Sequence, residues 1–234
     1  MGDSQGFPRH ISLPEIFVEN FSAAVDYLGL LDYVNREKIG VIGICGSGGF
    51  ALSAAQVDTR IKAVATASLY DMSYSARENL SKEDILAMKQ QLSIQRWTDA
   101  KNGYPEYNPT FPLTPADRVP DFLSLEAAIW FEFYGVRRGH HLHARGGFTT
   151  TSNLSFMNFN LLDHVNEISP RSILLIAGDH AHSRKYSEIV YEKAIKSKEL
   201  YIVKDANHID LYDKVDRIPF DKLEAFFKDT LHLK

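Results

Sequence analysis

The sequence IGVIGICGSGGFALSAA, residues 39–55, decides the fold of this chain. It begins as an apolar run of strand length, passes through a turn crowded with glycine, and continues as a short Ala-rich helical segment. A strand, a sharp turn and a helix in this order form a nucleophile elbow. The strained backbone of such an elbow accepts only small residues two positions before and after the nucleophile. Gly43 and Ser47 meet that demand around Cys45, whereas Cys45 and Gly49 meet it around Ser47.

The spacing alone therefore leaves two candidate nucleophiles, Cys45 and Ser47. Cys45 follows directly on the apolar run, while Ser47 would already lie in the turn, so the length of the strand favours Cys45. A thiol at the start of a helix also lies in the positive field of the helix dipole, which favours the thiolate. The alternative is a buried, unreactive cysteine, since free cysteine is among the most buried residue types.

A dinucleotide-binding unit is a second interpretation of the same residues. The segment Gly46-Ser47-Gly48-Gly49-Phe50-Ala51 fits the G-x-G-x-x-A pattern, and Asp71 ends the next apolar strand. The pattern is short and leaves the histidine motif near the C-terminus unexplained. We therefore place this interpretation second.

Outward from the elbow, strands and helices alternate, which predicts an α/β fold with a mostly parallel sheet. Further strands are predicted at 61–69, 171–177 and 199–203, and helices at 14–31, 50–57, 184–196 and 216–231. Residues 72–168 interrupt the alternation with helical patterns at 82–97, 122–134 and 153–168 around an irregular stretch at 104–120. We interpret this middle third as a lid-like insertion within a single domain covering residues 1–234.

The bulk composition narrows the class of protein. The chain has 234 residues, 44% of them hydrophobic, and a formal net charge of −4, which gives no electrostatic footprint for nucleic acid. No apolar run approaches the roughly 20 residues that a membrane helix needs. The N-terminal residues do not form a signal peptide. Because the one cysteine cannot form an internal disulfide, a reducing, cytoplasmic setting is expected.

A second motif, Lys204-Asp205-Ala206-Asn207-His208-Ile209-Asp210-Leu211-Tyr212-Asp213, follows the last predicted strand. A histidine in a loop after that strand can reach a nucleophile at the end of a neighbouring strand. There it would act first as general base and then as general acid. His208 is therefore the candidate base, and a histidine on a solvated surface loop is the alternative.

The two motifs, with Phe156-Met157-Asn158-Phe159, Ile168–Gly178 and Ala181-His182-Ser183, resemble the dienelactone-hydrolase-like branch of the α/β-hydrolases. This branch includes the fungal polyketide transferases, and the resemblance extends from Asp3 to near the C-terminus. It implies that Cys45 is the nucleophile and His208 the base. It also implies an acyl-enzyme mechanism on an ester, lactone or thioester, without a cofactor.

The acid of the triad is less clear from the resemblance. Family members usually place it three residues after the glycine that ends the penultimate strand, and Ala181 occupies that position here. Asp179 is the nearest carboxylate, and Asp71 is the other candidate. We favour Asp179, although a Cys–His pair can also work with little help from an acid.

The resemblance further matches Gly2–Arg9 to the loop after the fourth strand, so the first four strands are expected to be absent. The backbone N–H of Gly46 then remains as one oxyanion donor, while its partner from the loop after the third strand would be missing. Strand 39–44 would become an apolar sheet edge, which favours self-association, for example as a homodimer. A non-catalytic remnant or binding module is therefore the alternative function.

The remaining histidines are interpreted as non-metal residues. His140, His141 and His143 cluster in a loop without a nearby carboxylate, and His182 is expected to organise the site. The sequence thus predicts a hydrolase or acyltransferase with a small-molecule acyl substrate, no metal, and neither nucleic acid nor a membrane as partner.

Overall fold

The computed structural model of the chain describes residues 5–233, so the start of the predicted loop match at Gly2–Arg9 lies outside the described residues. The chain forms two compact units. The sheet unit comprises Pro14–Ala76 and Phe159–Lys234, and the insertion unit comprises Met1–Leu13 and Arg77–Asn158. Each is described by itself below.

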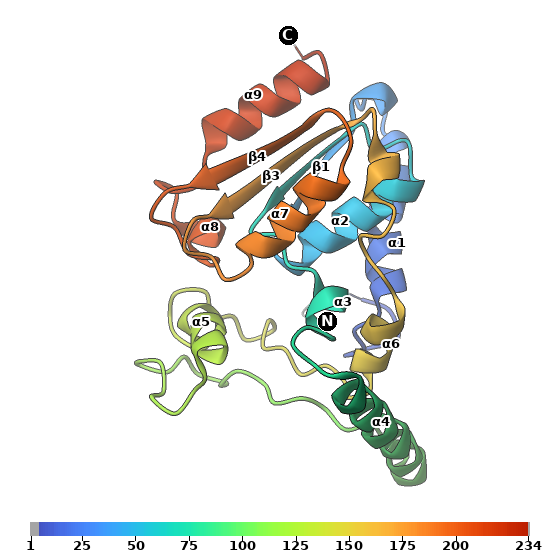
Figure 1. Cartoon of the computed structure of the whole chain (residues 1–234), viewed down its shortest axis with the longest axis vertical. Coiled ribbons are helices and arrows are strands. Elements are labelled where there is room, and N and C mark those ends of the chain that lie inside the picture. The colour runs from blue at the N-terminus through green and yellow to red at the C-terminus, as the bar shows by residue number, and fades with distance from the viewer. Residues whose placement is uncertain (1–4, 234) are drawn as a thin grey trace. The chain divides into compact units, whose positions relative to one another are not determined.

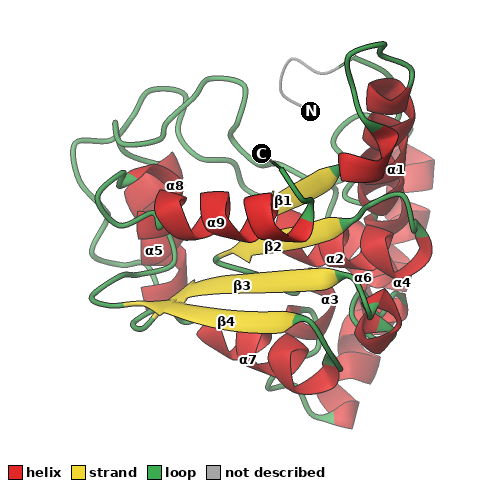
Figure 2. Cartoon of the chain, turned by 90° about the horizontal axis from the view of Figure 1, so that it is seen from above, coloured by secondary structure: helices red, strands yellow, loops and turns green. Residues whose placement is uncertain are grey.

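The sheet unit contains four parallel strands in the order β1-β2-β3-β4, as Figure 2 shows. Their bounds are Gly40–Ile44 for β1, Ala63–Ala67 for β2, Ser172–Gly178 for β3 and Lys198–Val203 for β4. The predicted α/β class and parallel sheet are therefore confirmed. Parallel strands joined by helices need cover on both faces, which explains the near-continuous apolar sequences of β1, β2 and β3.

Helices cover both faces of this sheet (Figures 1 and 2). On one face, α2 (Gly46–Val57) packs on β1 and β2, and α7 (Arg184–Lys193) packs on β3 and β4. The helix α1 (Pro14–Gly29) packs on α2, where the rings of Phe17 and Phe50 lie 5.0 Å apart.

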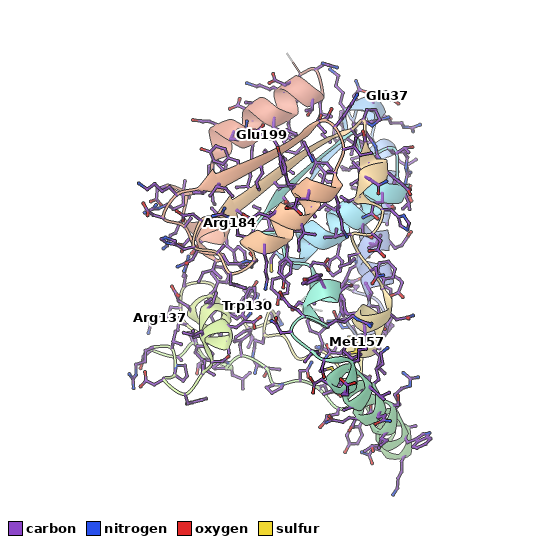
Figure 3. The ribbon with its side chains drawn as sticks, in the orientation of Figure 1. Glu37, Trp130, Arg137, Met157, Arg184 and Glu199 are labelled. Atoms are coloured by element: carbon purple, nitrogen blue, oxygen red, sulfur yellow. The ribbon has the colours of Figure 1, made fainter. Side chains whose placement is uncertain are left out.

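The opposite face is covered by α9 (Phe220–Thr230). Side chains of α9 and its end pack into an apolar cluster with residues of β2, β3 and β4, namely Ala63, Ala65, Leu174, Ile176, Val203, Leu223, Phe226, Phe227 and Leu231. Glu199 of β4, labelled in Figure 3, forms an ion pair of 2.5 Å with Lys222 of α9. Burial of this apolar cluster is the main force that holds α9 on the sheet, because a partly exposed ion pair contributes at most about 1 kcal/mol.

The strands differ in burial. Every residue of β2 is buried, whereas Ile42 and Ile44 of β1 are 48% and 45% exposed. In the part of the chain that the structure describes, β1 has a partner on one side only, β2. The predicted apolar sheet edge is thus present in the described residues.

In its described residues, the insertion unit is built from three helices and long irregular segments. Its helices are α4 (Lys82–Asn102), α5 (Leu125–Tyr134) and α6 (Ser152–Asn158). A capping box between Ser81 and Asp84 starts α4, and Gly103, with φ of +77°, ends it. Isolated bridges, such as the one between Tyr107 and Thr149, join the irregular segments. Among the described residues, no helix is both long and apolar enough to cross a membrane.

One helix prediction in this region is wrong in length. The pattern at 153–168 predicts a continuous helix, but α6 ends at Asn158 and a separate 3-10 turn, η2, covers Val165–Ile168. The residues between them turn back toward α2, where the side-chain amide of Gln56 donates to the carbonyl of Leu161. Tertiary hydrogen bonding therefore overrides the helical periodicity here.

Candidate active site

Cys45 stands at the sharp turn between β1 and α2 with φ of 56° and ψ of −129°. Its N–H donates to the carbonyl of Ala67 (3.1 Å), and its own carbonyl accepts from the N–H groups of Gly48 (2.9 Å) and Tyr70 (3.0 Å). A positive φ at a residue other than glycine is strained, and these three hydrogen bonds hold it in place. This is the backbone conformation that a nucleophile elbow requires.

The small residues around the turn are needed for close approach. A Cβ on Gly43 would lie 2.4 Å from the carbonyl oxygen of Ser47, so a larger residue there would force the turn apart. Ser47 itself lies in the first turn of α2, beyond the strained residue. The structure thus places the apex at Cys45 and not at Ser47.

Gly48 and Gly49 serve helix packing. A Cβ on Gly48 would lie 3.0 Å from the side chain of Leu69, and one on Gly49 would lie 3.2 Å from the carbonyl of Tyr70. Both glycines are buried inside α2. Their presence in the G-x-G-x-x-A pattern is explained by this contact with the chain that follows β2.

His208 lies in the loop between β4 and the short helix α8 (Asp210–Asp213), with 1% of its surface exposed. Its carbonyl accepts a hydrogen bond of 2.6 Å from the hydroxyl of Ser68, which follows β2. Burial, and to a smaller extent the nearby His182, whose ring centroid is 4.9 Å away, lower the pKa of His208 to about 3. The imidazole is therefore neutral at physiological pH.

Both ring nitrogens of His208 are hydrogen bonded to hydroxyl groups. The Oγ of Ser183, at the start of α7, lies 2.5 Å from Nδ1, and the Oη of Tyr212 lies 2.7 Å from Nε2. Arg184, labelled in Figure 3, is the residue that directly follows Ser183.

The thiol of Cys45 is hydrogen bonded to the side chain of Tyr212 and to the backbone N–H of Gly46. Burial raises the pKa of the Cys45 thiol above its ordinary value, and these two hydrogen bonds act in the opposite direction. The site therefore brings the predicted nucleophile and base together through Tyr212, with Gly46 beside the sulfur. At rest it holds a neutral thiol and a neutral imidazole.

Asp179, the predicted acid, is not placed at His208. Its carboxylate accepts hydrogen bonds from the backbone N–H groups of Ala206 (3.2 Å) and Asp205. Burial by itself would raise the pKa of Asp179, but these backbone donors bring it below the ordinary value. The hydroxyl of Ser183, at the start of α7, lies at Nδ1 of His208, where the sequence predicted a carboxylate. The carboxylate of Asp179 is instead held by the backbone of the loop at 205–206.

Asp71, the other candidate acid, caps a different element. Its side chain accepts from the N–H groups of Ser73 and Tyr74, both at 3.0 Å, and so starts the short helix α3 (Met72–Ser75). Burial raises the pKa of Asp71, and the two N–H donors oppose that rise. Its position at the end of a strand thus reflects helix capping.

One group of side chains has the composition of a cation site. Ligand atoms of Asp179, His180 and Asp205 lie within 4.8 Å of one another, on the surface. His140, in contrast, bonds to the carbonyl of Pro112 through Nε2 (3.0 Å), and the predicted histidine cluster with His141 and His143 forms no such group among the described residues.

Ser183 and Tyr212 are the two residues to which the sequence analysis assigned no role. Tyr212 stands four positions after His208, a spacing that puts two side chains on one face of a helical turn. That spacing was the available signal. For Ser183 the signal was its place in the Ala181-His182-Ser183 motif, but nothing in the spacing indicated its contact with His208, 25 positions away.

Comparisons with known proteins identify relatives of this chain. Residues 16–128 match the family model described as BAAT / Acyl-CoA thioester hydrolase C terminal, a stretch that contains Cys45 but not His208. The protein YcjY of Escherichia coli is 31% identical over 98% of this chain and 76% of its own length.

The Pseudomonas aeruginosa protein PA2218 is 45% identical over 98% of this chain, and this chain spans 62% of its length. The crystal structure of PA2218 has a TM-score of 0.91 to this chain at 44% identity, covering 98% of this chain and 72% of that one. The structure of the α/β hydrolase GrgF from Penicillium sp. sh18 has a TM-score of 0.76 at 21% identity, covering 99% of this chain and 77% of its own, and shows the shared fold. The chain therefore belongs to the same family as YcjY and PA2218, and its fold is that of the α/β-hydrolases.

Proposed function

We propose that the chain carries the active site of a hydrolase or acyltransferase that acts on an ester, lactone or thioester. The observation that carries this proposal is the strained Cys45 at the β1–α2 turn, joined through one hydroxyl to the buried imidazole of His208. The family model and the structural relatives support the same class of chemistry. No cofactor is needed for it.

In this reaction Cys45 loses its proton, which ends on Nε2 of His208, and the thiolate attacks the carbonyl carbon. The N–H of Gly46, which lies beside the sulfur, donates to the oxyanion that forms. Collapse of this intermediate expels the alcohol or thiol, which takes the proton from His208, and leaves an acyl group on the sulfur. Water in a hydrolase, or an alcohol in a transferase, then releases the acyl group.

Ser183 takes the part that a carboxylate plays in a triad. When Nδ1 carries the proton, the hydroxyl of Ser183 accepts the Nδ1–H of His208, and Nε2 is then able to accept a proton. A hydroxyl carries no charge, so it stabilises the imidazolium less than a carboxylate does. A thiol nucleophile tolerates this, because thiols ionise far more readily than hydroxyls.

The test measures hydrolysis of p-nitrophenyl acetate by the wild type, Cys45→Ala, His208→Ala and the control Ser47→Ala. We expect the first two variants to fall to the background rate and the control to keep the wild-type rate, because Ser47 lies beyond the apex. Intact-mass spectrometry after a brief reaction should show one added acetyl group on the wild type and on Ser47→Ala, and none on Cys45→Ala. Wild-type turnover that survives in Cys45→Ala would reject the proposal and leave the binding-module alternative.

A further inference from the structure

The hydroxyl of Tyr212 lies between the two groups that exchange a proton in the proposed reaction. Its oxygen is 2.7 Å from Nε2 of His208, and the same hydroxyl is hydrogen bonded to the thiol of Cys45. The thiol and the imidazole are therefore connected through a third side chain.

Tyr212 is held in this position by the helical turn on which it stands. Tyr212 lies on α8, and His208 comes directly before Ile209, the residue that caps this helix. Their rings meet edge to face with centroids 5.4 Å apart. The carboxylate of Asp210 accepts from the N–H of Asn207 (3.0 Å) and fixes the start of this turn.

The protonation of Nδ1, the ring nitrogen that faces Ser183, sets the direction of the hydrogen bonds at Nε2. When Nδ1 carries the proton and donates it to Ser183 at 2.5 Å, Nε2 is an acceptor. The Tyr212 hydroxyl then donates to Nε2, and the lone pairs of the same oxygen face the thiol as acceptors. The thiol, the phenol and the imidazole thus form one directed chain of donors.

We propose that Tyr212 relays the proton from Cys45 to His208, an inference that rests on the proposed function of this site. The S–H proton moves to Oη as the phenolic proton moves to Nε2. The products are a thiolate, a neutral tyrosine and an imidazolium, so no proton is gained or lost. When the acyl-enzyme forms, the leaving group takes a proton by the reverse route.

This arrangement also explains how a buried site can form a thiolate and an imidazolium during the reaction. Because burial disfavours both the thiolate and the imidazolium, neither is present at rest. After the transfer, the phenolic O–H donates to the thiolate and accepts from Nε2–H. The relay therefore separates the two charges by one side chain and solvates both of them.

The test follows alkylation of Cys45 by iodoacetamide between pH 6 and 10, which needs no substrate and reports the only cysteine of the chain. In Tyr212→Phe, which keeps the ring and loses the hydroxyl, we expect alkylation at pH 7 to fall by about tenfold or more, with the pH midpoint shifted upward. The control Tyr201→Phe, on β4, should match the wild type. Equal or faster alkylation of Tyr212→Phe would overturn the relay and show that Tyr212 blocks the base.

A double variant separates a relay from a local effect of the hydroxyl on the sulfur. If the proton passes through Tyr212 to His208, the two residues act in series, so Tyr212→Phe should cause a smaller loss in a His208→Gln background than in the wild type. Multiplying losses would overturn the relay. Thermal melts of each variant confirm that it is folded. Because alkylation requires no turnover, this result stands apart from the ester assay, and failure of one is distinguishable from failure of the other.

Discussion

Acid should destabilise this protein through one buried histidine. Burial lowers the pKa of His208 from 6.5 to about 3 in the folded chain, whereas the unfolded chain has the ordinary value. Below pH 6.5 the unfolded state therefore binds a proton that the folded state does not. The stability present above pH 6.5 is lost as the pH falls toward 3.

For one proton, the free energy of unfolding changes by about 1.4 kcal/mol per pH unit. Between pH 6.5 and 4 the free energy of unfolding therefore falls by about 3 kcal/mol. The carboxylates with lowered pKa values, such as Asp58, Asp179 and Glu224, contribute stability that is lost mainly below about pH 4.5, so most of this window reports on the histidine. Asp71, whose pKa is raised, acts in the opposite direction, but it is present in every variant compared.

The assay is urea unfolding followed by circular dichroism at half-unit pH steps from 7 to 4, on the wild type and His208→Gln. The variant should start less stable and then show a flatter dependence on pH, with the difference between the two curves shrinking by about 3 kcal/mol. If the curve of His208→Gln stays parallel to the wild type, the burial argument is refuted.

Two further predictions concern the turn and the sheet edge. Gly43→Ala should destabilise the chain by about 3 kcal/mol or more in urea unfolding, because its methyl group would meet backbone at 2.4 Å. At Gly103 an added methyl group would meet open space, and only the positive φ opposes it, so Gly103→Ala should lower the free energy of unfolding by about 1–2 kcal/mol. If Gly43→Ala and Gly103→Ala destabilise the chain equally, the packing argument is contradicted. The described edge strand should drive self-association of this 234-residue chain, so light scattering should show a dimer that Ile42→Lys with Ile44→Lys converts to monomer. A monomeric wild type would count against this role for β1.

Much of the fold could be predicted because its signals are local. The apolar runs that became β1, β2 and β3 are nearly continuous, and parallel strands covered on both faces need no alternation to be recognised. The helical stretch at 153–168 was the failure, since its periodicity continues through residues that the tertiary structure turns toward Gln56. Local pattern says where a helix is favourable, and long-range hydrogen bonds decide where it ends.

For the site, the sequence by itself determined that Cys45 stands in a turn that only small residues permit, and that His208 follows the last strand. These conclusions depend on spacing along the chain, which is visible without coordinates. Only the tertiary structure decided the partners of the imidazole. Ser183 and Tyr212, and not Asp179, bond to its two nitrogens, because hydrogen bonds depend on positions in space within about 3 Å. A carboxylate that lies in the expected motif, such as that of Asp179, can be bound by backbone N–H groups instead of by the histidine. The sequence does not show which of these donors the carboxylate binds.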